Sequence, residues 1–119
     1  MDVGETLTVV DRAQWRRWLA RHHGAKKEIW LVYYKKSSGK TGISYEESVE
    51  EALAYGWIDG QIKGLDETRF AGRFTPRKPG STWSPSNIAR LKKLMAQKRM
   101  AAPGLAMLPA ELKSVRSAK

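Results

Sequence analysis

The sequence predicts a single α+β domain in which a small, mainly antiparallel sheet is packed by three or four helices. Three observations lead to this fold class. Several segments show the apolar spacing of an amphipathic helix behind a capping residue. One short run is apolar on both of its alternating faces, and two later segments alternate around a short polar loop. A chain of 119 residues can form one hydrophobic core and rarely divides further.

The first predicted helix covers about residues 12–22. Asp11 can accept hydrogen bonds from the free backbone N–H groups at its start. Gly24 is placed to end it in a left-handed conformation. Its apolar face consists of Trp15, Trp18, Leu19 and His22. This spacing is that of a helix with one face in the core.

The second predicted helix covers about residues 45–55 and begins with a capping box formed by Ser44 and Glu47. Gly56 is placed to end it. Four glutamates crowd its first two turns, where the helix dipole favours negative charge: Glu46, Glu47, Glu50 and Glu51. We expect these carboxylates to form a solvated face.

A strand covered on both sides is predicted over about residues 28–35, and a β-hairpin over about residues 57–76. An odd-numbered loop at 65–67 brings the apolar residues of the hairpin to one face. It pairs Ile62 with Phe70, Gly60 with Gly72, and Ile58 with Phe74. The same register sets Asp59 across from Arg73, which predicts a structural ion pair.

A third helix is predicted over about residues 85–100, capped by Ser84. A weaker fourth helix follows over about residues 105–115, after Pro103 and Gly104 interrupt the pattern. We therefore expect one domain over residues 1–105 and a basic C-terminal tail over 106–119 that frays at its end. Five tryptophans are expected to dominate the core.

Charge is distributed unevenly along the chain, whose formal net charge is +10. Residues 1–67 carry 10 basic and 11 acidic groups, and residues 68–119 carry 12 basic groups and one acidic group. A cationic second half favours an anionic partner, with a nucleic acid or a phosphate-bearing ligand as the main candidates. The absence of cysteine excludes disulfides, zinc ribbons, iron–sulfur clusters and cysteine nucleophiles. No metal-ligand spacing is present, and no cofactor is predicted.

The longest apolar run, residues 29–34, is too short to cross a bilayer, so no transmembrane segment is expected. The first residues show no signal-peptide pattern, which predicts a cytoplasmic location. We expect the protein to be a monomer.

The candidate anion site runs from the second strand of the hairpin into the third helix. It combines positive side chains, hydroxyl and amide donors, a stacking ring and a helix N-terminus. Its members are Arg73, Thr75, Arg77, Lys78, Ser81, Trp83, Ser84 and Asn87. The alternatives are structural: Ser84 only caps its helix, Trp83 fills the core, and Arg73 pairs with Asp59.

A secondary basic loop follows the first predicted strand and contains Lys35, Lys36 and Lys40. It lacks the glycine that a phosphate-binding Walker loop requires five positions before its Gly-Lys pair, since Tyr34 stands there. We expect it either to be a solvated connector or to lie near Arg77, because both segments follow strands of one sheet.

From Trp15 to Leu105 the order of motifs resembles the YdeI/OmpD-associated family, also called OmdA or bacteriocin-protection proteins. The motifs are Tyr34-Lys35-Lys36, Ser38-Gly39-Lys40, Glu47-Ser48, Glu51-Ala52-Leu53, Gly56-Trp57-Ile58-Asp59-Gly60, Arg73-Phe74-Thr75-Pro76-Arg77-Lys78-Pro79-Gly80-Ser81, Trp83-Ser84 and Asn87-Ile88-Ala89-Arg90. The resemblance implies tolerance of bacteriocins or antimicrobial peptides and association with an outer-membrane porin. It implies a periplasmic location in some descriptions, and it brings no catalytic residues.

These observations predict a non-enzymatic binding module for an anionic partner, without catalytic residues. A small enzyme is the alternative, using Asp59 with Arg73 and Arg77 on a phosphate- or carboxylate-bearing substrate. A third hypothesis is an adaptor that binds another protein chain, which an exposed patch of tryptophan would indicate.

Overall fold

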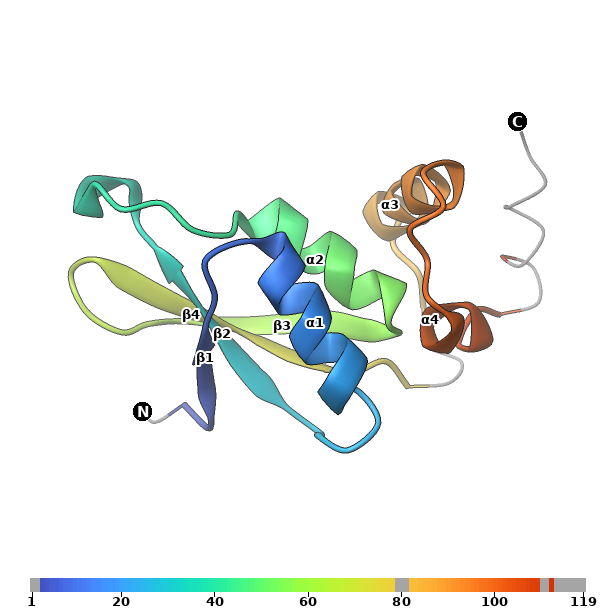
Figure 1. The fold of residues 1–119 in the computed structure, drawn as a ribbon, viewed down its shortest axis with the longest axis horizontal. Helices are drawn as coiled ribbons and strands as arrows, with labels where there is room; N and C mark the ends of the chain where they lie inside the picture. Colours follow the sequence, from blue (N-terminus) through green and yellow to red (C-terminus); the bar gives the residue numbers. More distant parts are fainter. Residues whose placement is uncertain (1–2, 79–81, 110–111, 113–119) are drawn as a thin grey trace.

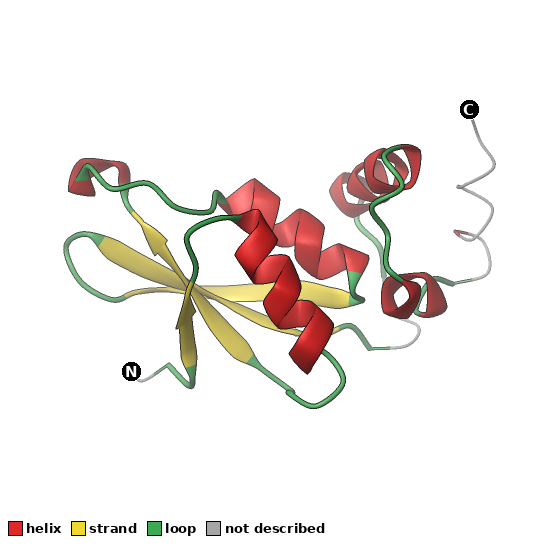
Figure 2. Cartoon of the chain, in the orientation of Figure 1, coloured by secondary structure: helices red, strands yellow, loops and turns green. Residues whose placement is uncertain are grey.

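The computed structural model describes residues 3–78, 82–109 and 112 and has the predicted α+β fold (Figures 1 and 2). In chain order its elements are β1 (Thr6–Thr8), α1 (Arg12–His22), β2 (Ile29–Tyr34), the 3-10 turn η1 (Lys36–Ser38), α2 (Tyr45–Ala54), β3 (Trp57–Gly64), β4 (Arg69–Pro76), α3 (Pro85–Ala96) and α4 (Ala102–Ala106). Helices α1 and α2 lie on the same side of the sheet, and α3 and α4 lie at one end of the molecule (Figure 1).

The described strands form one sheet in the order β1-β2-β4-β3. The β3–β4 pair is the predicted hairpin. The β2–β4 pair is also antiparallel, which agrees with the prediction of a mainly antiparallel sheet, and β1 is parallel to β2. The sequence analysis did not predict β1, because three residues give too little alternation to identify a strand.

Strand β2 is buried on both faces, which confirms the prediction from its composition. Ile29, Leu31 and Tyr33 contribute to the core under α1 and α2. On the opposite face, Trp30 and Val32 are each only 4% exposed. β2 is a central strand, between β1 and β4.

The predicted register of the hairpin is wrong. Ile58 lies opposite Thr75, and Ile62 lies opposite Gly72, with an irregularity of the ladder between Asp59 and Ile62. Thr75 and Gly72 are three residues apart and therefore on opposite faces, so the two isoleucines also face opposite sides. The hairpin is not held by a common isoleucine–phenylalanine face, and Ile62 is 54% exposed.

The loop of the hairpin is organised by Asp66. Its carboxylate accepts hydrogen bonds from the backbone N–H groups of Thr68 and Arg69 and pairs with the Arg69 guanidinium at 2.8 Å. The bond from Arg69 and the Thr68 amide lower the pKa of Asp66 to about 2. The loop covers residues 65–68, one more than predicted, because this side-chain turn needs the extra residue.

The predicted helix starts are confirmed. Asp11 accepts the N–H of Gln14 at 3.0 Å, Ser44 and Glu47 form a reciprocal capping box, and Ser84 caps α3. Gly56 has the expected left-handed backbone, with φ 78°. The prediction for Gly24 is wrong, because α1 ends at His23 in right-handed geometry and Gly24 has no positive φ.

The described core has two parts. The first lies between α1, α2 and the sheet and is built around Trp15, Leu19, Trp57 and Phe74. The second joins α2 to the C-terminal helices and contains Leu53, Leu91, Leu94 and Leu108, with Trp83, Met95, Met100, Leu105 and Leu112 against it. Packing thus continues beyond residue 105.

The C-terminal helices differ from the prediction in their bounds. α3 ends at Ala96 rather than near residue 100, and Lys98 just after it has a positive φ of 57°. α4 covers Ala102–Ala106, ahead of most of the predicted range 105–115, in which Leu112 is helical and residues 110–111 and 113–115 lie outside the described residues. Pro103 starts this helix rather than breaking one, because a proline is tolerated in the first turn.

Candidate functional site

Two neighbouring glutamates of α2 are buried, although the sequence analysis placed them on a solvated face. Glu50 is 2% exposed and Glu51 is 0% exposed. Cations from both sides of α2 pair with them at 2.5 to 2.8 Å: Arg12 and Arg16 from α1, Lys93 from α3, and Arg99 from the segment that follows α3. The expectation of a solvated face was wrong because α2 lies between two helices that supply the opposite charge.

This network keeps both glutamates ionised. Burial acts to raise the pKa of Glu51, but hydrogen bonds from Arg16, Arg99 and Arg12 outweigh it, so the pKa is lowered. The pKa of Glu50 is lowered in the same way, with Lys93 and Arg12 outweighing burial.

The pairing also changes the interpretation of the cationic second half of the chain. Arg90 pairs with Glu46 at 2.9 Å, Lys93 with Glu50 and Arg99 with Glu51. Much of the positive charge on α3 therefore neutralises acids of α2.

The sheet divides the predicted anion site. Arg73 and Thr75 alternate with the core residue Phe74, so they lie on the face opposite α1 and α2. There Arg73 pairs with Glu28. The predicted pair of Arg73 with Asp59 is therefore wrong, because the ladder sets Asp59 opposite Phe74.

Arg77, Lys78 and Trp83 lie where the chain leaves β4 for α3. Arg77 is only 4% exposed, with its guanidinium 4.1 Å from the centre of the Trp83 ring. Burial lowers its pKa, against the opposing effect of Asp59. Lys78 is exposed, and Ser81 lies outside the described residues.

The polar groups at the start of α3 have structural partners. Ser84 accepts the N–H of Asn87 at 3.1 Å, which confirms the capping alternative. The side-chain oxygen of Asn87 accepts a hydrogen bond from Arg90 at 2.9 Å. Trp83 packs against the second core cluster, in agreement with the alternative that it fills the core. These residues build the junction between α2 and α3.

Asp59 has a partner that the sequence analysis missed. The hydroxyl of Tyr45, in the first turn of α2, donates a hydrogen bond of 2.5 Å to its carboxylate. Burial and this bond raise the pKa of Tyr45. The structure brings Asp59 near Arg77 but not near Arg73, so the predicted catalytic group is not assembled as expected.

The secondary basic loop does not lie near Arg77. β2 and β4 are antiparallel, with Tyr34 opposite Arg69 and Ile29 opposite Phe74, so Lys35 and Arg77 leave the sheet at opposite ends. Lys35 donates to the carbonyl oxygen of Asp66 at 3.2 Å. Lys40 lies 5.4 Å from the centre of the Tyr34 ring, and Lys36 is exposed. The loop is a connector held locally.

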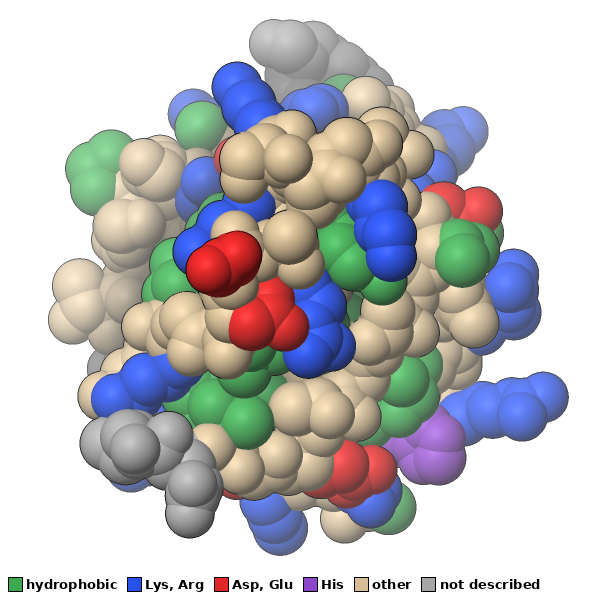
Figure 3. All heavy atoms as spheres, turned by 90° about the vertical axis from the view of Figure 1, so that its left-hand side faces the viewer, with side chains coloured by type: hydrophobic (Ala, Val, Ile, Leu, Met, Phe, Trp, Pro, Cys, Tyr) green, Lys and Arg blue, Asp and Glu red, His purple; other side chains and the backbone are tan. Residues whose placement is uncertain are grey.

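Several described cations have no carboxylate partner among the described residues, and they come from every part of the fold. They are Arg17, Arg21, Lys27, Lys35, Lys36, Lys40, Lys63, Lys78, Lys92 and Lys98. Figure 3, which views the end with η1 and the hairpin loop, shows positive side chains scattered and interspersed with acidic ones. The positive charge is not gathered on the single predicted face.

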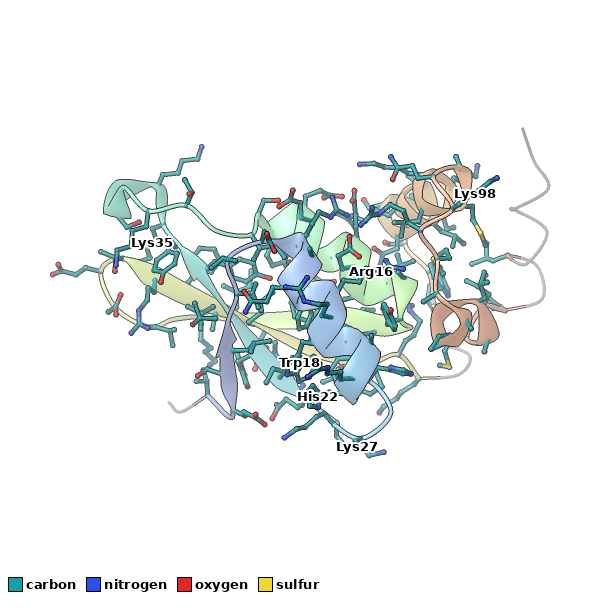
Figure 4. All side chains as sticks on the ribbon, in the orientation of Figure 1. Arg16, Trp18, His22, Lys27, Lys35 and Lys98 are labelled. Atoms are coloured by element: carbon teal, nitrogen blue, oxygen red, sulfur yellow. The ribbon has the colours of Figure 1, made fainter. Side chains whose placement is uncertain are left out.

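A hollow between α1 and β1 forms a second candidate site, which the sequence analysis missed. It encloses about 250 Å³ and is lined by Leu7, Val9, Gln14, Arg17, Trp18, Arg21 and His22. Trp18 and His22 lie next to each other on α1, with ring centres 4.9 Å apart (Figure 4). The feature of the sequence that could have indicated this hollow is the pair Arg17 and Arg21, which are four residues apart on the first helix.

No metal centre is evident within residues 3–78, 82–109 and 112, where no group of His, Cys, Asp or Glu side chains has a suitable arrangement. His22 and His23 diverge as expected: His22 contacts Trp18, and His23 hydrogen-bonds to the Leu19 carbonyl at 2.8 Å. Within the same residues, no helix combines the length and apolar character that crossing a bilayer requires.

Comparison with known proteins gives a family but no activity. A family described as a domain of unknown function, DUF8412, matches residues 7–107. No curated protein and no solved structure matches the chain. The resemblance to the YdeI/OmpD-associated proteins stays a prediction. Because the match covers most of the fold, from β1 to the end of α4, the chain belongs to the DUF8412 family of domains of unknown function.

Proposed function

We propose that the protein is a non-enzymatic binding module for an anionic partner, with a nucleic acid or another phosphate-bearing ligand as the partner. The observation that carries the proposal is the set of cations left without a carboxylate after the ion pairs are assigned in the described part of the chain. The described acids without an ion pair are fewer, namely Asp11, Asp59 and Glu67. The surplus of positive charge attracts polyanions.

Catalysis has less support than binding, because the polar residues near β4 make structural contacts within the protein. Asp59 accepts a hydrogen bond from Tyr45, and Ser84 and Asn87 serve the start of α3. An adaptor that binds another protein has less support, since the large apolar side chains that the described part exposes, Val10 and Ile62, lie on different elements.

The resemblance to the YdeI/OmpD-associated family extends this proposal to tolerance of bacteriocins or antimicrobial peptides. Many such peptides are cationic, and a protein of net charge +10 repels them. Protection therefore acts through an anionic envelope component or through regulation, rather than by sequestering the peptide. The proposal includes a monomeric protein in the cytoplasm, whose partner is either a nucleic acid or another phosphate-bearing ligand.

Titration with mixed-sequence DNA and RNA at several salt concentrations tests the proposal. If contacts to phosphate drive binding, the logarithm of the affinity falls linearly with the logarithm of the salt concentration, with a slope of about −0.9 per neutralised phosphate on duplex DNA. A protein that binds neither DNA nor RNA at low salt, and gives no NMR shifts with inorganic phosphate, overturns the proposal.

A further inference from the structure

We propose that the hollow between α1 and β1 is the binding site for a nucleoside phosphate, either free or as one unit of a single strand. Arg17 and Arg21 take the phosphate, and the aromatic pair of Trp18 and His22 takes the base. This inference rests on the proposed function and assigns it a site and a ligand class.

The arginines of α1 fall into two groups, one that pairs with the buried glutamates of α2 and one that lines the hollow. Arg12 and Arg16 point to α2, where Glu50 and Glu51 neutralise them. Arg17 and Arg21 are exposed and have no carboxylate partner in the described residues. They are four residues apart on the same helix and repel each other. The helix dipole favours Arg21 in the last turn but does not account for Arg17.

A bound phosphate relieves this repulsion. Two guanidinium groups spaced by one helical turn can each donate paired hydrogen bonds to phosphate oxygens. Gln14 lies one turn earlier in the same hollow. Its side-chain oxygen already accepts the N–H of Val10 at 2.8 Å, which leaves the amide NH2 group as a further donor to the ligand.

The aromatic part of the hollow is a series of rings that runs outward from the core. Buried Trp15 stacks on half-buried Trp18 at 5.5 Å, and Trp18 contacts half-buried His22 at 4.9 Å. Trp57 holds Trp18 from the side, edge-on at 5.9 Å. The rings are therefore fixed in place, so a base that extends the series at its outer end meets a preorganised surface. Figure 4 shows Trp18 and His22 together, with Lys27 beyond them in the loop after α1.

A second hollow among the described residues does not suit this ligand. It encloses about 320 Å³ between α2 and α3 and contains the carboxylates of Glu46 and Glu50, which repel a phosphate. Its cations, Arg90 and Lys93, already pair with those carboxylates. The hollow at α1 has cations and aromatic rings but no acid in its lining.

The test compares two double variants that remove the same charge. Arg17→Ala with Arg21→Ala changes the hollow. Lys92→Ala with Lys98→Ala removes two cations of the α3 region that have no carboxylate partner in the described part of the chain. Each protein is titrated with adenosine 5′-monophosphate and with a short single-stranded RNA, and circular dichroism checks that both variants fold. Spectra of ¹⁵N-labelled protein follow the indole N–H of Trp18, which a Trp18→Phe variant identifies.

We expect the wild-type Trp18 signal to shift with the nucleotide or with the RNA. The Arg17 and Arg21 variant should bind that ligand at least about tenfold more weakly, since it loses the charge-assisted hydrogen bonds to phosphate. The affinity of the Lys92 and Lys98 variant for the same ligand should fall clearly less. If the Arg17 and Arg21 variant loses more affinity for adenosine 5′-monophosphate, the ligand is a free nucleotide. If it loses more affinity for the RNA, the ligand is one unit of a single strand.

The assignment of the hollow is overturned if both double variants bind both ligands alike. In that case salt-dependent binding to RNA by the wild type still supports the proposed function, so the two failures are distinguishable. Replacement of His22 by alanine checks the stacking part separately. It should weaken binding of the nucleotide and leave the response to inorganic phosphate unchanged, and equal effects on both would overturn the role of the rings.

Discussion

Arg99 and Glu51 form an ion pair of 2.5 Å that joins the segment after α3 to the centre of α2. The carboxylate of Glu51 is fully buried, and arginines of α1 bind it from the other side. One side chain therefore holds together three segments that are distant in the sequence. Since a buried charge without partners is costly, the helices on both sides of α2 depend on it.

Replacement of Glu51 should be severely destabilising. Glu51→Ala leaves the guanidinium groups of Arg16 and Arg99 without their carboxylate and should lower the free energy of unfolding by about 3–5 kcal/mol. Urea denaturation measures the change, with Glu67→Ala at an exposed position as the control, expected within about 0.5 kcal/mol. A loss below about 1 kcal/mol for Glu51→Ala would show that the network contributes little.

Stability should fall in acid because of the same network. The pKa values of Glu50 and Glu51 are lowered in the folded protein, below the ordinary value of 4.5. The unfolded chain thus binds more protons as the pH drops through that value, so the stabilisation is complete above about pH 5 and is lost progressively below it. Thermal unfolding between about pH 6 and pH 3 measures this, and Glu50→Gln with Glu51→Gln should flatten the profile. An unchanged slope in that variant would assign the acid sensitivity to other carboxylates.

The hydroxyl of Tyr45 should stabilise the junction between α2 and β3. Tyr45→Phe removes the 2.5 Å hydrogen bond to Asp59 and should cost about 1.5 kcal/mol, since the acceptor is charged. Tyr34→Phe is the matched control, because no hydrogen bond of the Tyr34 hydroxyl is present among the described residues. Chemical denaturation compares the two, and equal losses would contradict a specific role for the Tyr45 bond.

Gly104 should tolerate no side chain. A Cβ atom there would lie 2.1 Å from the carbonyl oxygen of Ala54, at the end of α2. Gly104→Ala should therefore push α4 away from α2 and cost about 1–3 kcal/mol or more. Gly24→Ala is the control, since a Cβ atom at Gly24 meets nothing within 4 Å and its φ is not positive. If the melting temperature of Gly104→Ala matches that of the control, α4 does not pack as described.

The features that sequence reasoning predicted correctly depend on local chemistry. Asp11, Ser44 and Ser84 cap their helices by accepting the backbone N–H of the residue three positions later. The composition of β2 alone indicates burial on both faces. The fold class follows from the order of such elements, and the structure confirms it.

The features that sequence reasoning missed depend on contacts between distant segments of the chain. The irregularity between Asp59 and Ile62 shifts the hairpin register, and nothing in the alternation of β3 predicts it. The partners of Glu50 and Glu51 are 35 to 48 residues away, so a local reading assigns both glutamates to solvent. Burial of Arg77 was unexpected because arginine is rarely buried without tertiary partners.

The candidate site was predicted from the chemistry of Arg73 to Asn87. Arg73 and Thr75, however, lie on the sheet face opposite the helices, whereas Arg77 follows the end of β4 and lies over Trp83, which packs against the second core cluster. The hollow at α1 needed the position of β1, a strand too short to recognise. Residue type therefore indicated the kind of ligand, whereas the place of binding required the tertiary structure.

The position of α2 between α1 and α3 also determines the order in which its contacts can form while the chain is being synthesised. A nascent chain that has emerged only as far as β4 contains Glu50 and Glu51 but neither Lys93 nor Arg99. At that stage the arginines of α1 alone face the carboxylates, and the apolar surface that α3 later covers is open to water. The packing of α2 is therefore complete only after residue 99 has left the ribosome, and until then the side of α2 that faces α3 exposes acidic and apolar side chains.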